Sequence, residues 1–306
     1  MRVAAVDIGT NSVLLLVAEH TPESGLRPLE ERATITRLGQ GVDASQTLSP
    51  AAVTRTNECL AGYAAIVRAA RVERVGVVGT SAMRDAQGGR VVVDRVRELF
   101  GEPPRVLSGD EEARLTFRGA LSGITVEPTS EVVVFDIGGG STEVICGGRG
   151  GEESFSYLRS FDVGSVRLTE RLSPGDPPDP RELEIIRLAI REIFASGAPL
   201  PKAAEPIGVA GTMTTLAAVS MGLREYDPAR IHGHVMSRSE LDEVVKRLTS
   251  LPLAARRQCP GLDPKRADVI VAGGVLALEV LDQLGASAVR ISDRGVRWGL
   301  AEELSR

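Results

Sequence analysis

Residues 3–17 read VAAVDIGTNSVLLLV, and residues 132–146 read VVVFDIGGGSTEVIC. Each stretch is an apolar run, then Asp-Ile-Gly-x-x-Ser, then a second apolar run. Each predicts two strands joined by a glycine-containing turn, with Asp7 or Asp136 near the end of the first strand. Two ordinary hairpins can carry so short a motif. A pair separated by about one small domain instead favours two related domains.

The two turns have the composition of a phosphate-binding site. Backbone amides bind phosphate oxygens and a neighbouring carboxylate positions a hydrated metal, so two facing copies would form a phosphate clamp. A third candidate loop opens a helix after a strand, where free amides and the helix dipole favour an anion. The candidate phosphate-binding residues are Gly9, Thr10, Asn11 and Ser12, then Gly138, Gly139, Gly140 and Ser141, and finally Gly211 and Thr212.

Composition limits the class of protein. With 306 residues and 42% hydrophobic residues the chain can build two cores, and alternating strand and helix patterns indicate an α/β fold. A net charge of −5 argues against a nucleic-acid partner but leaves room for a polyanion bound in a local basic cleft. We find no leader and no membrane-length apolar run, and three scattered cysteines fit a reducing compartment, so we expect a cytoplasmic protein without a membrane partner.

Local signals predict individual elements. Ser49 and Pro50 begin a helix that reaches about residue 70, and strands are expected over residues 33–38 and 74–78. Further helices are expected over residues 91–100, 181–195 and 237–250. Asp263 and Pro264 predict a helix start, and we expect that helix to continue through residues 273 and 274 to residue 284.

The chain contains, in this order, DIGTNS, TSAMRDA, LSGDEEARL, DIGGGSTE, DVGSVRLTE, GVAGTMTTLAA and ISDRGVRWGL. These blocks closely resemble the exopolyphosphatase/guanosine pentaphosphatase (Ppx/GppA) phosphatase family, in the superfamily of actin, sugar kinases and heat-shock ATPases. The resemblance implies an α/β chain of two actin-like (ribonuclease H-like) domains with an interdomain active-site cleft. Domain I would span residues 1–121, with the helix of residues 295–306 packing back on it, and domain II would span residues 122–294.

The resemblance also assigns roles to single residues. Glu112, in GDEEAR, matches the family's catalytic glutamate that activates the attacking water, and Arg84, in TSAMRDA, matches an arginine that contacts substrate phosphates. Asp136 and Glu143 match the family's magnesium-associated acids, and Asp7 is a plausible third. Mg²⁺ is the expected cofactor, with Mn²⁺ as an alternative and a monovalent cation as a further candidate.

Each assignment has a structural alternative. Glu112 can simply be part of an acidic first helical turn that complements the helix dipole, and Arg84 can be a solvated helix residue. Glu143 can be a strand residue that faces solvent. Arg167 is a weaker candidate for phosphate binding.

Other features of the sequence give weaker evidence about function. His232 and His234 suit a loop or interface role, because no further metal ligand lies at the right spacing. Trp298 is expected to anchor the last helix by packing into the core. The pairs Arg256–Arg257 and Lys265–Arg266 can line a polyanion path, although solvated faces are the default interpretation.

The resemblance implies a Mg²⁺-dependent exopolyphosphatase, a homodimer that releases terminal orthophosphate from inorganic polyphosphate. We expect shorter chains as substrates, since no additional helical HD-type domain follows residue 306. The alternative substrate is guanosine pentaphosphate, hydrolysed at its 5′ terminal phosphate. Two other classes stay open: a superfamily kinase or ATPase whose acceptor is not water, and a non-catalytic sensor of an alarmone or of polyphosphate.

Overall fold

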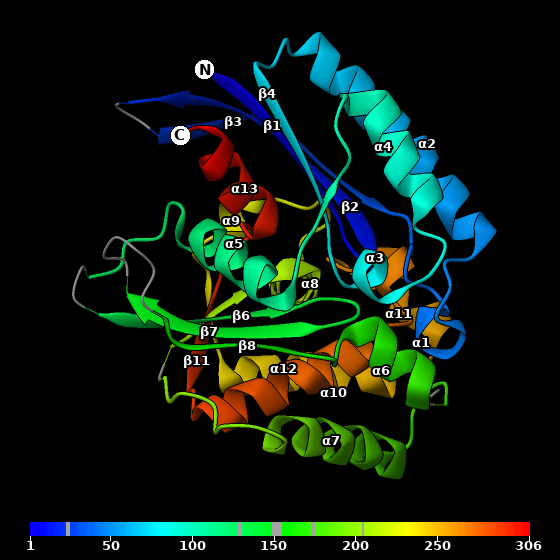
Figure 1. Ribbon diagram of the computed structural model, residues 1–306. Helices are drawn as coiled ribbons and strands as arrows, with labels where there is room; N and C mark the ends of the chain where they lie inside the picture. The colour runs from blue at the N-terminus through cyan, green and yellow to red at the C-terminus, as the bar shows by residue number, and fades with distance from the viewer. Residues whose placement is uncertain (23–24, 128–129, 149–154, 173–174, 204) are drawn as a thin grey trace. The chain divides into compact units, whose positions relative to one another are not determined.

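The computed structural model describes residues 1–22, 25–127, 130–148, 155–172, 175–203 and 205–306 (Figure 1). The chain divides into two compact units, each built around its own sheet. Unit 1 comprises Met1–Gly119 and Gly295–Arg306, and unit 2 comprises Ala120–Arg294. The α/β class expected from the sequence is confirmed.

Unit 1 contains a five-stranded sheet in the order β3-β2-β1-β4-β5. Its strands are β1 (Arg2–Ile8), β2 (Ser12–Thr21), β3 (Gly25–Ile35), β4 (Arg74–Gly79) and β5 (Arg105–Val106). The first three strands pair antiparallel, whereas β4 pairs parallel with β1 and β5 pairs parallel with β4. The helices are α1 (Val42–Ser45), α2 (Pro50–Ala69), α3 (Ser81–Asp85), α4 (Arg90–Phe100), α5 (Gly109–Leu121) and α13 (Val296–Leu304).

Successive side chains along β1 point to opposite faces of the unit 1 sheet. Most of them are apolar and buried, so the sheet packs an apolar surface on each face. Val6 packs with Leu60 of α2 and Val92 of α4, and these two helices lie side by side in Figure 1. On the other face Ala5 packs with Trp298 of α13, which is fully buried as the expected anchor of that helix. The side chain of Ser49 accepts a hydrogen bond from the backbone of Ala52 and caps α2 as predicted.

The last helix of unit 1 packs closely against α5. A Cβ atom on Gly299 would lie 2.0 Å from the carbonyl oxygen of Leu115, and one on Gly119 would lie 2.0 Å from the carbonyl oxygen of Gly295. Only glycine allows backbones to approach this closely. The helix α5 is therefore fixed by a segment that follows it in the sequence by most of the chain.

Unit 2 contains a six-stranded sheet in the order β10-β11-β9-β6-β7-β8. Its strands are β6 (Glu131–Ile137), β7 (Thr142–Gly148), β8 (Phe155–Phe161), β9 (Ile207–Val209), β10 (Val235–Ser237) and β11 (Ala288–Ile291). Its helices are α6 (Ser165–Leu172), α7 (Pro180–Ala195), α8 (Ala210–Ser220), α9 (Pro228–Ile231), α10 (Arg238–Ser250), α11 (Leu253–Arg256), the 3₁₀ helix η1 (Pro264–Arg266) and α12 (Ile270–Leu284).

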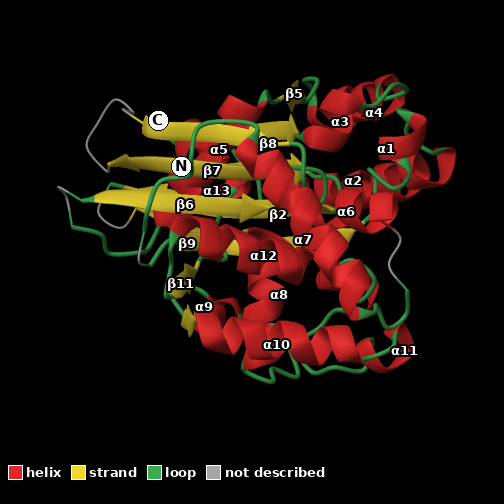
Figure 2. Ribbon diagram, turned by 90° about the horizontal axis from the view of Figure 1, so that it is seen from below, coloured by secondary structure: helices red, strands yellow, loops and turns green. Residues whose placement is uncertain are grey.

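The centre of unit 2 is α12, which packs against α6, α7, α8 and α10 (Figure 2). Almost every residue of this helix is buried, including Glu279. The Nη1 atom of Arg187 and the Nε atom of Arg191, both on α7, lie 3.1 and 2.7 Å from the carboxylate oxygens of Glu279. A buried charge requires such partners, so these ion pairs fix α7 on α12.

Two expectations about elements differ from the structure. The third strand runs over Gly25–Ile35 rather than residues 33–38, because it pairs with β2 along that strand's full length. The helix expected from Asp263 to residue 284 is interrupted: Asp263 caps η1, and α12 begins only at Ile270. Between them the carbonyl oxygen of Ala267 accepts a hydrogen bond from the Arg256 guanidinium, which anchors the junction. Among the described residues, no helix has the length and apolarity needed to cross a lipid bilayer.

Candidate active site

The two quoted hairpins close in the same way. The backbone N–H of Gly9 donates to the carbonyl oxygen of Ser12 at 3.0 Å, and that of Gly138 donates to Ser141 at 3.0 Å. Strands β1 and β2, and likewise β6 and β7, pair antiparallel on either side of these turns. The internal repeat predicted from the sequence is therefore a repeat of structure.

Backbone hydrogen bonds join the first turn to the segment that follows β3. The backbone N–H of Arg37 donates to the carbonyl oxygen of Asn11 at 2.9 Å, and that of Gly39 donates to Thr10 at 2.8 Å. Both turn residues are buried. Because these carbonyl oxygens are engaged by the protein, the turn has a fixed shape.

Asp7 lies at the end of β1 with only 7% of its surface exposed. Among the described residues none donates a hydrogen bond to its Oδ1 atom. Burial raises the pKa of Asp7 to about 7, and the positive charge of Arg297 offsets part of that rise. An unsatisfied buried carboxylate of this kind is suited to a cation.

Arg84 and Glu112 form an ion pair inside unit 1. The Arg84 Nη1 atom lies 3.1 Å from the Glu112 Oε2 atom and donates a second bond to the carbonyl oxygen of Leu107 at 2.9 Å. The side chain of Glu112 is 10% exposed and that of Arg84 is 25% exposed. Arg84 is therefore not a solvated helix residue.

The acids at the start of α5 have different roles. Asp110 and Glu111 are exposed, whereas Glu112 is buried. Glu111 accepts a hydrogen bond from the backbone N–H of Ser108 at 2.8 Å, and the Ser108 side chain accepts one from the backbone of Glu111 at 3.2 Å. This reciprocal pair is a capping box. The helix-dipole interpretation thus suits Asp110 and Glu111 and leaves Glu112 for another role.

Asp136 and Glu143 lie directly opposite each other in the register of β6 and β7. They are 8% and 1% exposed, so the alternative that Glu143 faces solvent is wrong. Directly opposed carboxylates repel, and a divalent cation between them would relieve that repulsion. In the described part of the chain no cluster of three or more metal-ligating side chains occurs. Two opposed carboxylates suit Mg²⁺, which keeps several waters when bound.

The second turn is held by α6. The backbone N–H of Ser165 donates to the carbonyl oxygen of Gly138 at 3.0 Å, and that of Arg167 donates to Gly139 at 3.1 Å. The Arg167 Nε atom also donates to the carbonyl oxygen of Gly140 at 2.8 Å. Arg167 therefore supports the turn through its backbone and its side chain.

The third loop begins α8 with strained backbone. Ala210 adopts a φ of 68°, a left-handed conformation that favours glycine. The hydroxyl of Thr212 donates to the carbonyl oxygen of Ile137 at 3.0 Å, which ties this loop to the end of β6. In the parallel pair β6 and β9 these ends meet at one edge of the sheet, so Gly211 and the second turn are neighbours.

Arg266 contacts this third loop, and the default interpretation of it as a solvated residue is wrong. A Cβ atom on Gly211 would lie 1.9 Å from its Nη1 atom. Desolvation lowers the pKa of Arg266, and the nearby Asp263 carboxylate partly offsets that effect. A half-buried guanidinium beside a helix N-terminus is suited to an anion. The sequence signal was the glycine at 211, whose missing side chain makes room for the arginine.

Two other sequence candidates have structural roles. Arg256 is buried and donates to the carbonyl oxygens of Leu248 and Leu251, so it does not line a polyanion path. His232 follows α9, and burial, with a contribution from Arg294, lowers its pKa to about 4. It is therefore neutral near pH 7.

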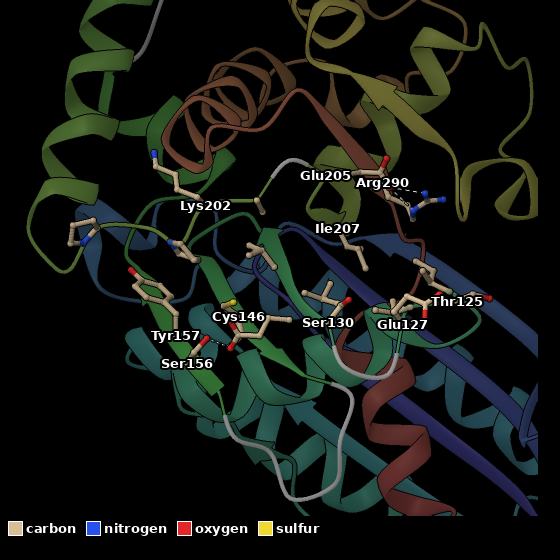
Figure 3. Close-up of a pocket in the computed structure, with 18 residues that line it drawn as sticks. Thr125, Glu127, Ser130, Cys146, Ser156, Tyr157, Lys202, Glu205, Ile207 and Arg290 are labelled. Carbon is tan, nitrogen blue, oxygen red and sulfur yellow. Dashed lines mark hydrogen bonds and ion pairs between the residues drawn. The ribbon is translucent and has the colours of Figure 1, made fainter.

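A cavity of about 700 Å³ lies at the other end of the unit 2 sheet (Figure 3). Its lining includes Glu131 at the start of β6, whereas Asp136 lies near the end of that strand. Its cationic side chains are engaged: Arg290 lies 2.6 Å from the Glu205 carboxylate, and Lys202 donates to a backbone carbonyl oxygen at 2.8 Å. This cavity does not have the charge for a polyanion and is separate from the candidate active site.

Comparison with known proteins identifies the family of this chain. The profile of the Ppx/GppA phosphatase family matches residues 16–305. The chain belongs to this family. A curated relative, Exopolyphosphatase 2 of Mycobacterium tuberculosis (strain ATCC 25618 / H37Rv), is 36% identical over 99% of this chain and 98% of that protein.

Solved structures of family members share the fold. The Aquifex aeolicus PPX-GPPA enzyme superposes with a TM-score of 0.82 at 30% identity, covering 99% of each chain. An exopolyphosphatase from Cytophaga hutchinsonii superposes with a TM-score of 0.88 at 24% identity, covering 100% of this chain and 98% of its own. The expected fold of two actin-like domains is thereby confirmed.

Proposed function

We propose that this protein is an exopolyphosphatase that hydrolyses the terminal phosphoanhydride bond of inorganic polyphosphate. The observation that carries the proposal is the 36% identity to Exopolyphosphatase 2 along 99% of the chain. The buried Arg84–Glu112 pair and the opposed carboxylates of Asp136 and Glu143 support it, because they supply the groups that such hydrolysis needs.

In the proposed reaction Glu112 accepts a proton from a water molecule as that water attacks the terminal phosphorus. The new bond joins the water oxygen to phosphorus, and the bond between that phosphorus and the bridging oxygen breaks. Orthophosphate leaves, and the bridging oxygen becomes a terminal oxygen of the shortened chain. Glu112 suits the base because Arg84 and its buried position fix its carboxylate.

We assign phosphate binding to the amides of residues 9–12 and 138–141, to the third loop at Gly211 and Thr212, and to the arginines. A guanidinium carries five N–H donors, so Arg84 can contact a substrate phosphate while it keeps its bond to Glu112. Arg266, seated on Gly211, would neutralise charge beside the third loop. These groups stabilise negative charge on the transferring phosphoryl group.

We propose Mg²⁺ as the divalent cofactor, held by Asp136 and Glu143, with Asp7 as a further acid. When bound, this ion neutralises phosphate charge and orients the phosphoryl group. The fit rests on the opposed, buried pair of unit 2 and on the unsatisfied Oδ1 atom of Asp7. Titrating the metal-free protein with Mg²⁺ and with Mn²⁺ while recording phosphate release would test the choice of ion.

One steady-state assay separates the candidate functions. Phosphate release is measured at matched concentrations of short polyphosphate, long polyphosphate and guanosine pentaphosphate. The proposal expects the highest kcat/KM with polyphosphate. A higher value with guanosine pentaphosphate would replace it with the nucleotide hydrolase, and measurable binding without any phosphate release would favour a sensor. The homodimer implied by the resemblance stays a prediction, which light scattering of the purified protein would check.

A further inference from the structure

Three polar residues form a straight row across unit 2. Asp136 of β6 lies opposite Glu143 of β7, and Glu143 lies opposite Ser160 of β8. Residues directly opposed across antiparallel strands share one face of a sheet, with Cβ atoms about 4.5–5.5 Å apart. The row therefore places a hydroxyl beside the central carboxylate and a second carboxylate on its other side.

The hydroxyl of Ser160 is bonded to that carboxylate. Its Oγ atom donates to the Oε1 atom of Glu143 at 2.6 Å, a length typical of a hydrogen bond to an ionised oxygen. Glu143 is 1% exposed, so bulk water cannot replace this donor without a rearrangement. Ser160 thus constrains the rotation of the Glu143 carboxyl group.

This constraint matters because Asp136 and Glu143 are two acidic side chains directly opposed in a buried place. Like charges directly opposed across strands are unfavourable unless something compensates them. A donor on the side of Glu143 away from Asp136 holds one oxygen of the carboxyl group and so fixes the orientation of that group. Groups that hold a metal-binding carboxylate in this way affect metal affinity by about 10- to 100-fold.

We propose that Ser160 is a positioning residue that orients Glu143 to bind the divalent cation. The inference rests on the proposed function, since it assigns Glu143 to the same ion. In this proposal Ser160 acts through Glu143, to which its hydroxyl donates. The rest of β8 offers a matched control: Ser156, on the same strand, directs its hydroxyl at 3.5 Å to the carbonyl oxygen of Cys146 rather than to Glu143.

The test measures cation binding without substrate. Full-length wild type and the variants Ser160→Ala, Ser160→Thr, Ser156→Ala and Glu143→Gln are titrated with Mn²⁺, and free Mn²⁺ is read by electron paramagnetic resonance. We expect Ser160→Ala to weaken Mn²⁺ binding about 10- to 100-fold. Ser160→Thr, which keeps the hydroxyl, and Ser156→Ala should bind as wild type. Thermal unfolding without cation checks that each variant is folded.

The outcomes separate this inference from the proposed function. Wild-type Mn²⁺ affinity in Ser160→Ala, together with weaker binding in Glu143→Gln, overturns the role of Ser160. Unchanged binding in Glu143→Gln overturns both the cation site and the inference. If wild type binds Mn²⁺ and Ser160→Ala binds it weakly, but neither polyphosphate nor guanosine pentaphosphate is hydrolysed, the proposed function fails and the role of Ser160 stands.

Discussion

Replacing Glu112 by glutamine tests the proposed base with little disturbance to the fold. Glutamine has the same shape and keeps an oxygen for the bond that Arg84 now makes at 3.1 Å. That bond changes from a charged to a neutral acceptor, which costs about 1 kcal/mol of stability or less, because Arg84 is partly exposed and screened. A glutamine oxygen is a far weaker base than a carboxylate, so kcat should fall by about 10²–10⁴-fold. In activation free energy this is about 3–5 kcal/mol.

The neighbouring residue supplies the control. Glu111 lies on the same helix turn, is exposed and accepts the capping bond from the backbone N–H of Ser108. Glu111→Gln keeps an oxygen for that cap and should retain wild-type turnover. Both variants are assayed for phosphate release from polyphosphate at saturating Mg²⁺, with urea unfolding as the check on stability. A Glu112→Gln enzyme with near wild-type kcat, or an equal loss in Glu111→Gln, would refute the assignment.

Three further substitutions test the turns, the buried acid and the helix contact. Asp7→Asn removes a carboxyl group whose pKa is about 7 in the folded chain, compared with an ordinary value of 3.8. As pH rises between these two values the unfolded chain loses this proton before the folded chain does, so the wild type should lose stability relative to the variant. Urea unfolding without cation near pH 5 and near pH 8 would show that difference widening, and a constant difference contradicts the buried acid. Gly211→Ala places a Cβ 1.9 Å from Arg266 and should raise the KM for polyphosphate about 10- to 100-fold, whereas an unchanged KM would remove both residues from phosphate binding. Gly299→Ala meets the carbonyl oxygen of Leu115 at 2.0 Å and should lower the unfolding free energy of unit 1 by about 1–3 kcal/mol, so wild-type stability in urea would show that the helices separate easily.

The sequence predicts best where a signal is local. The hairpins, the cap at Ser49 and the helix that begins after Ser237 depend on neighbouring residues, and each occurs where expected. The strand β3 was largely missed because its many exposed polar residues follow no apolar alternation, and only its pairing with β2 defines it. The break before α12 was missed for a similar reason, since the Arg256 side chain that anchors it comes from another helix.

In the candidate site, too, local signals could be read from the sequence and tertiary contacts could not. Position in a first helical turn could not separate Glu111 from Glu112, because burial and the contact with Arg84 depend on tertiary structure. Family resemblance selected Glu112 where local chemistry left the choice open. Ser160 had no sequence signal of its own, because its importance comes from its register across β7. Residues that bind through their backbone can thus be predicted from a turn motif, whereas residues that support others cannot.

The discontinuity of unit 1 has a consequence for synthesis on the ribosome. Helix α5 carries Glu112, yet α13, which packs against it through Gly299, is translated only after all of unit 2. At roughly 5–20 residues per second, the nascent chain exposes this surface of α5 for about ten seconds or more before its partner emerges. The proposed base can therefore acquire its supporting helix only after unit 2 has been made, which ties the onset of activity to the synthesis of α13.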